Sequence, residues 1–157
     1  MIRVLLCLLM SVAAPCCAQS RAEAEYYAKA YAAHYGIPFD FLGALIAQES
    51  GWKHCVVSSK GAMGLMQLMP STAKEMHVLN LCDVSANISA GVRRLAWLKS
   101  RFHGDWRLVA AAYFAGEARI AACGLSCSDP QVLAYVASIR NRVSRAHLVL
   151  VDLGRVR

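Results

Sequence analysis

A single glutamate, Glu49, is the most informative of the ten acidic residues in this 157-residue chain. It ends a predicted apolar helix that starts near Asp40, and Ser50 and Gly51 follow it directly. Partial burial and the negative end of the helix dipole both disfavour an ionised carboxylate at such a position. A carboxyl group whose pKa is raised in this way stays protonated near neutral pH and can act as a general acid. Taken alone, the position of Glu49 fits a salt bridge at a helix end better than it fits a catalytic acid. The catalytic interpretation therefore needs support from other residues.

Residues 61–67 supply that support, because Gly61 and Gly64 allow tight turns and a close approach of the backbone to a ligand. Within this segment Met66 can form an apolar wall of a groove. Gln67 offers both a hydrogen-bond donor and an acceptor to a sugar or an amide. The segment therefore predicts one side of a binding groove.

Two tyrosines on other predicted helices are candidate partners for such a carboxyl group. Tyr113 lies in the last turn of a helix that Gly116 ends, and Tyr135 lies on the final helix. A tyrosine hydroxyl can reach a carboxyl from either place, although each tyrosine alone is more often a half-buried packing residue.

These residues must be positioned by helices, since the chain is rich in alanine and has no long alternation of apolar and polar residues. The sequence predicts an all-α fold. A loop-rich segment covers residues 52–70, and the tail 147–156 fits either a strand or a helix end. The predicted helices are 21–34, 40–49, a short one after Pro70, one from Asn87 as N-cap to Phe102, one from Asp105 to Ala115, and a last one opened by Asp129 and Pro130.

Residues 1–18 have the layout of a secretory signal peptide, with Arg3 before an apolar run and small residues at its end. The run is too short to span a bilayer. We expect cleavage after Ala18, which leaves one domain at 19–157; an uncleaved anchor is the alternative.

Four cysteines remain after that cleavage, namely Cys55, Cys82, Cys123 and Cys127. Export to an oxidising compartment makes two disulfides the expected state. Of the three connectivities, we favour Cys55–Cys82 and Cys123–Cys127. A zinc site that includes His54 is the alternative, but neither a CxxC pair nor an HxxxH spacing supports it.

Five segments, taken in order, carry a resemblance to a known family. The whole set resembles the transglycosylase domain of soluble lytic transglycosylases, which has the lysozyme-like α fold, and it covers about residues 37–145. The segments are Ala47-Gln48-Glu49-Ser50-Gly51-Trp52, Gly61 to Pro70, Asn87-Ile88 before Ala90-Gly91, Ala112 to Gly116, and Tyr135-Val136.

The resemblance implies cleavage of peptidoglycan between N-acetylmuramic acid and N-acetylglucosamine. It assigns the role of single catalytic acid to Glu49. It also implies that Ser50, Met66 and Gln67 line the substrate groove, and that Tyr113 and Tyr135 orient the glutamate and the sugar.

Most glycosidases use two carboxyl groups, but no motif marks Asp40, Glu75, Asp83 or Asp105 as a partner of Glu49. The family's mechanism fits this absence. The acid protonates the glycosidic oxygen, the substrate's N-acetyl group stabilises the positive charge, and the glutamate then activates the C6 hydroxyl to give a 1,6-anhydro product. No metal or cofactor is expected.

The chain departs from the family's Ala-Tyr-Asn-Ala-Gly motif at Phe114, which stands where the motif has Asn. Glu117 and Ala118 also replace the usual Pro-Gly. Two alternatives stay open at this point. One is a hydrolytic, goose-type-like lysozyme on the same fold, and the other is a wall-binding assembly factor with weak or lost catalysis.

The net charge of +7 suggests an anionic partner. Export disfavours nucleic acid, so we expect peptidoglycan glycan strands in the periplasm, with a secretion or conjugation apparatus as a further partner by analogy. We expect a monomer without a transmembrane segment in the mature chain. Arginines gather near the C-terminus, at Arg140, Arg142, Arg145, Arg155 and Arg157.

Overall fold

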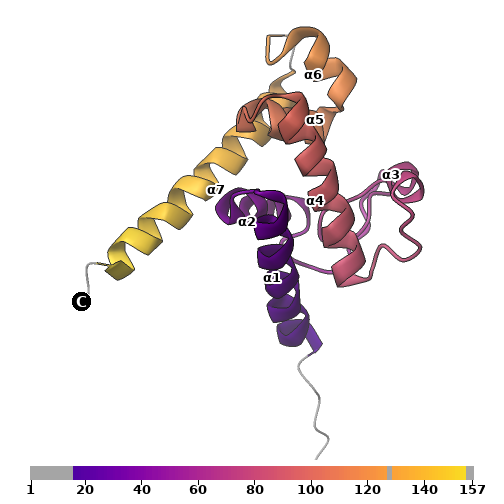
Figure 1. The fold of residues 1–157 in the computed structure, drawn as a ribbon, viewed down its shortest axis with the longest axis vertical. Coiled ribbons are helices and arrows are strands. Elements are labelled where there is room, and N and C mark those ends of the chain that lie inside the picture. Colours follow the sequence, from indigo (N-terminus) through magenta and orange to yellow (C-terminus); the bar gives the residue numbers. More distant parts are fainter. Residues whose placement is uncertain (1–15, 127–128, 155–157) are drawn as a thin grey trace, which may run out of the picture.

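The computed structural model describes residues 16–126 and 129–154 (Figure 1). The predicted signal peptide therefore lies almost wholly outside the described residues, as does Cys127. The described part is helical, and the predicted all-α fold is confirmed. None of its helices is both long and apolar enough to cross a membrane. The helices are α1 (Cys16–Tyr35), α2 (Phe39–Glu49), α3 (Pro70–Glu75), α4 (Val84–Arg101), α5 (Trp106–Ala115), α6 (Glu117–Cys123) and α7 (Pro130–Gly154).

Helix α1 packs along α4, and α2 and α5 both pack against α7 (Figure 1). Three alanines spaced four residues apart, Ala24, Ala28 and Ala32, are buried on one face of α1. Such a spacing puts them on a single stripe, and their small side chains let α1 approach its neighbour closely. The ambiguous tail continues as helix through Gly154, so the strand alternative is wrong.

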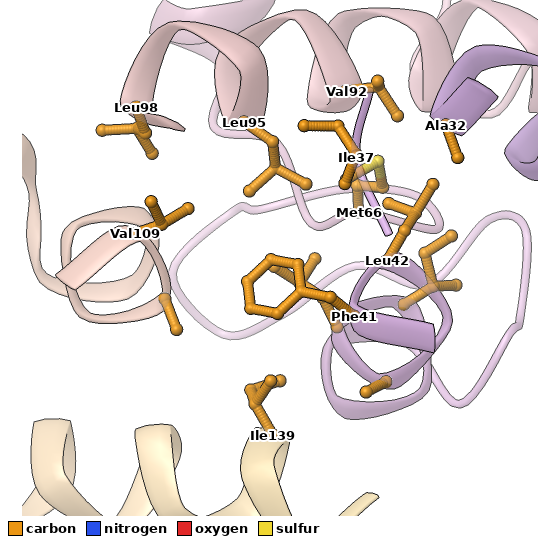
Figure 2. Close-up of a cluster of buried hydrophobic side chains, with 14 of the residues drawn as sticks. Ala32, Ile37, Phe41, Leu42, Met66, Val92, Leu95, Leu98, Val109 and Ile139 are labelled. Atoms are coloured by element: carbon orange, nitrogen blue, oxygen red, sulfur yellow. The ribbon is translucent and has the colours of Figure 1, made fainter. Parts of the chain in front are cut away.

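The hydrophobic core joins α1, α2, α4, α5 and α7 around the apolar face of α2 (Figure 2). Figure 2 shows Phe41 and Leu42 of α2 among side chains of the other helices, including Leu95 of α4 and Ile139 of α7. Because α2 is anchored on this apolar face, its last residue, Glu49, is held at a fixed place beside α7.

Aspartates cap the N-termini of α4 and α5. Asp105 caps α5 as predicted, accepting hydrogen bonds from the amides of Arg107 and Leu108. Helix α4 begins earlier than predicted, because Asp83 and not Asn87 is its N-cap, with Asp83 accepting from the Ala86 amide at 2.7 Å. The prediction for Asn87 was wrong because an Asn near a helix start fits either a cap or a buried anchor.

The Asn87 side chain is fully buried and ties the loop before α3 to α4. Its oxygen accepts from the Met66 amide at 2.9 Å, and its nitrogen donates to the carbonyls of Met63 at 3.1 Å and Leu81 at 3.0 Å. All three partners are backbone groups in loops, which have no helix ladder to satisfy them. Asn87 therefore supplies partners for the Met66 amide and the Leu81 carbonyl, and adds a second hydrogen bond to the Met63 carbonyl, which also accepts from the Leu68 amide at 3.0 Å.

Two glycines make room for this arrangement. At Gly64, where φ is +82°, a Cβ atom would lie 2.1 Å from the Asn87 side-chain nitrogen. At Gly91 it would lie 2.2 Å from the Met66 sulfur. These contacts explain the need for glycine at both positions, since a methyl group would push the loop off α4.

A disulfide joins Cys55 to Cys82 across 27 positions of sequence, which is the pairing that the sequence analysis favoured. It holds the loop after α2 to the segment before α4. Covalent closure of a loop of this length restricts the unfolded chain and keeps the two segments together in the native fold.

We predict that Asn87→Ala destabilises the protein by about 3 kcal/mol, because it leaves the Met66 amide and the Leu81 carbonyl without partners and removes one of the two hydrogen bonds that the Met63 carbonyl accepts. Urea unfolding measures the change. Ser89→Ala, a partly exposed position on the same helix, is the matched control and should change the free energy of unfolding by less than about 0.5 kcal/mol. Equal effects of the two substitutions would contradict the anchoring role of Asn87.

Candidate active site

Glu49 is the last residue of α2, and its side chain is half-buried. The Tyr135 hydroxyl, from α7, donates a hydrogen bond to the Glu49 carboxyl oxygen Oε1. Within the described residues Glu49 makes no ion pair, which argues against the helix-end salt bridge that its position alone suggested.

Burial raises the pKa of the Glu49 carboxyl, while the hydrogen bond from Tyr135 lowers it by a smaller amount. Desolvation disfavours the charged carboxylate, and a donor directed at the carboxylate favours it. Because the net direction is upward, Glu49 keeps its proton to a higher pH than an exposed glutamate does. Tyr135 gives the carboxylate a partner once the proton has left.

The two tyrosines differ in what their hydroxyls contact. Tyr135, which is 6% exposed, reaches Glu49, whereas the Tyr113 hydroxyl donates to the Met66 carbonyl oxygen at 2.9 Å. Burial raises the pKa of both phenols, and the negative charge of Glu49 raises it further. Both tyrosines are therefore neutral hydrogen-bond donors at physiological pH.

Gln67 forms part of the wall that faces Glu49, and its backbone is left-handed with φ at +46°. Its amide nitrogen donates to the carbonyls of Val56 at 3.0 Å and Gly64 at 2.9 Å. These two bonds fix which end of the amide is the nitrogen. The amide oxygen has no donor among the described residues, so it is the group left to accept a hydrogen bond from a ligand.

Met66 and Ser50 lie behind the cleft, in contrast to the groove positions that the resemblance implied. The Met66 side chain is fully buried and belongs to the core cluster drawn in Figure 2. The Ser50 hydroxyl donates to the Ile46 carbonyl at 3.2 Å and accepts from the Trp52 amide at 3.1 Å. Both residues support the end of α2 and the loop, and neither side chain lines the cleft.

A cleft of about 390 Å³ opens at Glu49 between the loop after α2, the end of α5 and the start of α7. Several lining residues, including Ser58, Lys60 and Gln131, could not be predicted from the sequence, because they lie in loops or at a helix start and carry no motif. Phe114 was recognised only as a departure from the family. The lining residues are Glu49, Ser58, Lys60, Ala62, Gln67, Met69, Tyr113, Phe114, Ala115, Arg119, Asp129, Gln131 and Val132.

Asp129 carries the second carboxyl group among the described residues of this lining. It accepts from the amides of Gln131 and Val132, both at 3.0 Å, and pairs with Arg119 at 3.2 Å. The hydrogen bond from the Val132 amide is the main cause that lowers its pKa. Asp129 is thus an ionised cap at the start of α7, and its cap hydrogen bonds and ion pair explain its presence without a catalytic role.

The other carboxylates that were considered as partners, Asp40, Glu75, Asp83 and Asp105, do not line this cleft. Within the part of the chain that the structure describes, three or more His, Cys, Asp or Glu side chains nowhere gather as they would around a metal ion. The groups that meet at this cleft include the Glu49 carboxyl, whose pKa burial raises, the Tyr135 hydroxyl that donates to it, and the amide of Gln67.

Solved structures resemble this helical arrangement. The 70-kDa soluble lytic transglycosylase of Escherichia coli matches with a TM-score of 0.70 and 26% identity, over 80% of this chain and 24% of that one. An inactive mutant of the lytic transglycosylase Slt from Pseudomonas aeruginosa matches with a TM-score of 0.65 and 26% identity, over 75% of this chain and 23% of that one. The fold is that of lytic transglycosylase domains.

Sequence comparison identifies the family. Residues 26–125 match the Transglycosylase SLT domain, which is more than half of the chain, so the chain belongs to this family. The soluble lytic murein transglycosylase of Escherichia coli (strain K12) is 31% identical over 131 residues, which cover 76% of this chain and 20% of that protein. The transglycosylase of Enterobacteria phage PRD1 is 37% identical over 87 residues, covering 55% of this chain and 32% of that protein. This chain thus spans a fifth to a third of the length of these two relatives.

We predict that the Glu49 carboxyl titrates above the usual range of a glutamate, and that Tyr135→Phe raises its pKa further. Removal of the hydroxyl takes away the donor that stabilises the carboxylate. Carbon-13 NMR of glutamate-labelled protein measures the titration, with the resonance assigned by its absence in Glu49→Gln. In the control Tyr113→Phe the lost hydroxyl contacts Met66, so a smaller change is expected. A lower pKa in Tyr135→Phe would contradict this electrostatic account.

Proposed function

We propose that this protein is a peptidoglycan lytic transglycosylase that uses Glu49 as its single acid and base. The observation that carries the proposal is the state of Glu49, which is half-buried in the cleft, free of ion pairs in the described residues and bonded to Tyr135. The family assignment supports the same substrate class, since the relatives are named murein transglycosylases.

In the first step protonated Glu49 donates its proton to the glycosidic oxygen as the bond to the N-acetylmuramic acid carbon breaks. Positive charge develops on that sugar, and its own N-acetyl group stabilises the charge. This substrate assistance takes the place of a second carboxylate, which agrees with the engagement of Asp129 as a helix cap.

In the second step the Glu49 carboxylate accepts the proton of the muramic acid C6 hydroxyl, whose oxygen bonds to the anomeric carbon. The product is a 1,6-anhydro sugar, and no water is consumed. The donor from Tyr135 suits this change of role, because it stabilises the carboxylate between the two steps. No metal or cofactor takes part in either step.

Gln67 is the residue we propose for substrate contact, through its free amide oxygen. Tyr113 acts by holding the Met66 carbonyl and with it the loop that carries Gln67. We also propose export to the periplasm, where the Cys55–Cys82 disulfide is stable and the cell wall is accessible. Opening of the wall for a secretion or conjugation machine remains a proposal by analogy with small exported members of the family.

We predict that Glu49→Gln lowers wall-degrading activity at least about a thousandfold, because the amide can neither donate the catalytic proton nor accept one. Turbidity loss of purified peptidoglycan measures the rate, and circular dichroism checks the fold. Glu75→Gln, an exposed position in α3 outside the cleft, is the matched control and should keep the wild-type rate. Near-normal activity of Glu49→Gln would reject Glu49 as the acid.

We predict that mass spectrometry of the released muropeptides finds 1,6-anhydro ends, which are lighter by one water than reducing ends. Reducing ends would instead identify a hydrolase of the lysozyme type. Binding to peptidoglycan without any released product would identify the wall-binding alternative. Each of these two results excludes the transglycosylase mechanism.

A further inference from the structure

Phe114 is the residue at which this chain departs from its family, and it lies one position before the end of α5. Its ring is stacked on the ring of Tyr135, with 4.6 Å between the centroids and 20° between the planes. The side chain is 46% exposed and lines the same cleft as Glu49. Phe114 therefore presents an apolar ring to the cleft that Glu49 lines, while one face of that ring is held against Tyr135.

The stack connects Phe114 to the acid through one intermediate residue. A parallel stack covers one face of each ring, so the exposed area of Phe114 belongs to its outer face and edges. Tyr135 is in turn only 6% exposed, and its hydroxyl is the donor to Glu49. Phe114 therefore covers the tyrosine that contacts the carboxyl, on the side of the open cleft.

We propose that Phe114 is a positioning residue, whose ring keeps the Tyr135 hydroxyl on the Glu49 carboxyl and keeps water away from that hydrogen bond. The inference rests on the proposed function and adds to it how this chain maintains its acid. An asparagine at this position has no ring to stack on Tyr135, and it would bring a polar amide to the same place. This chain thus uses an apolar cover where the family motif has a hydrogen-bonding group.

The charged and titratable groups around Glu49 come from each neighbouring element. Tyr135 comes from α7, Tyr113 from α5 and Lys60 from the loop, while Arg119 and Asp129 form an ion pair in the cleft. Arg94 of α4 lies 6.0 Å from the centre of the Tyr113 ring. Replacement of Phe114 by an uncharged residue alters none of these charges, so a change in pH dependence reports on the hydration of Glu49 and on its hydrogen bond from Tyr135.

The test is a set of Phe114→Ala, Phe114→Asn and Phe114→Tyr variants, assayed on purified peptidoglycan across pH. We expect kcat to fall about tenfold in the Ala and Asn variants, because the tyrosine loses its fixed position. Activity needs protonated Glu49 and is lost as pH rises through its pKa. Burial is the larger influence on that pKa, so water admitted to the site moves the alkaline limb to lower pH. Phe114→Tyr keeps an aromatic ring at this position, so its kcat and the alkaline limb of its pH profile should match those of the wild type.

Two controls separate positioning from a structural role. Leu133→Ala removes an equally exposed apolar side chain from α7 outside the cleft, at 47% exposure, and should leave kcat and the pH profile unchanged. The carbon-13 titration measures the pKa of the Glu49 carboxyl directly, in the absence of substrate turnover. Its midpoint should fall in Phe114→Ala, which is the opposite of the rise expected in Tyr135→Phe.

Wild-type kcat and an unmoved Glu49 midpoint in Phe114→Ala would overturn the proposal, and so would a faster Phe114→Asn variant. A lower melting temperature with an unchanged pH profile would show a structural role only, and would also overturn it. Should the wild-type protein release no product while Phe114→Ala still lowers the Glu49 midpoint, the proposed function fails and the positioning role stands. Phe114→Leu provides a milder variant that decides the question should Phe114→Ala not fold.

Discussion

The hydrogen bond between Tyr135 and Glu49 joins the end of α2 to α7, and it requires both helices to be fixed within fractions of an ångström. The hydrophobic face of α2 fixes one partner, and the packing of α7 on α2 and α5 fixes the other. Partial burial makes the bond chemically useful, because it raises the pKa of the carboxyl that the tyrosine supports. A fully exposed pair would be screened by water and would ionise like any surface glutamate.

The opposite wall of the cleft is a loop in which two isolated antiparallel bridges, Val57 with Met63 and Met63 with Leu68, pair part of the backbone. Side chains from the helices add further hydrogen bonds: Asn87 bonds to the Met66 amide and to the carbonyls of Met63 and Leu81, and the Tyr113 hydroxyl donates to the Met66 carbonyl. The Cys55–Cys82 disulfide adds a covalent connection to the same segment. A loop restrained in this way, with α4 packed against it, holds Gln67 toward the acid.

Much of this arrangement could be predicted from the sequence, since apolar spacing, capping aspartates and glycine stops place most of the helices. Glu49 was identifiable because acids are few and its flanking residues are characteristic. Three features were not accessible. Asn87 has the same local signal whether it caps a helix or anchors a loop, and only burial separates the two. Met66 lies next to a groove residue in sequence, yet Gly91 admits its side chain to the core. Asp129 was recognised as a helix start, but its place in the cleft depends on how α6 returns the chain to α7.

Phe114 stands where the family motif has Asn, and this difference bears on how much of a catalytic site must be polar. A carboxyl that works as acid and then as base needs one donor to stabilise its ionised form and an environment dry enough to raise its pKa. Tyr135 is the donor to the carboxylate. The side chain that covers Tyr135 on the cleft side keeps the surroundings of the carboxyl dry. An aromatic ring does this directly, through contact area and exclusion of water, and leaves no unpaired amide in the cleft. The departure from the motif is therefore compatible with catalysis, since it alters the cover of the acid and leaves the acid and its donor in place.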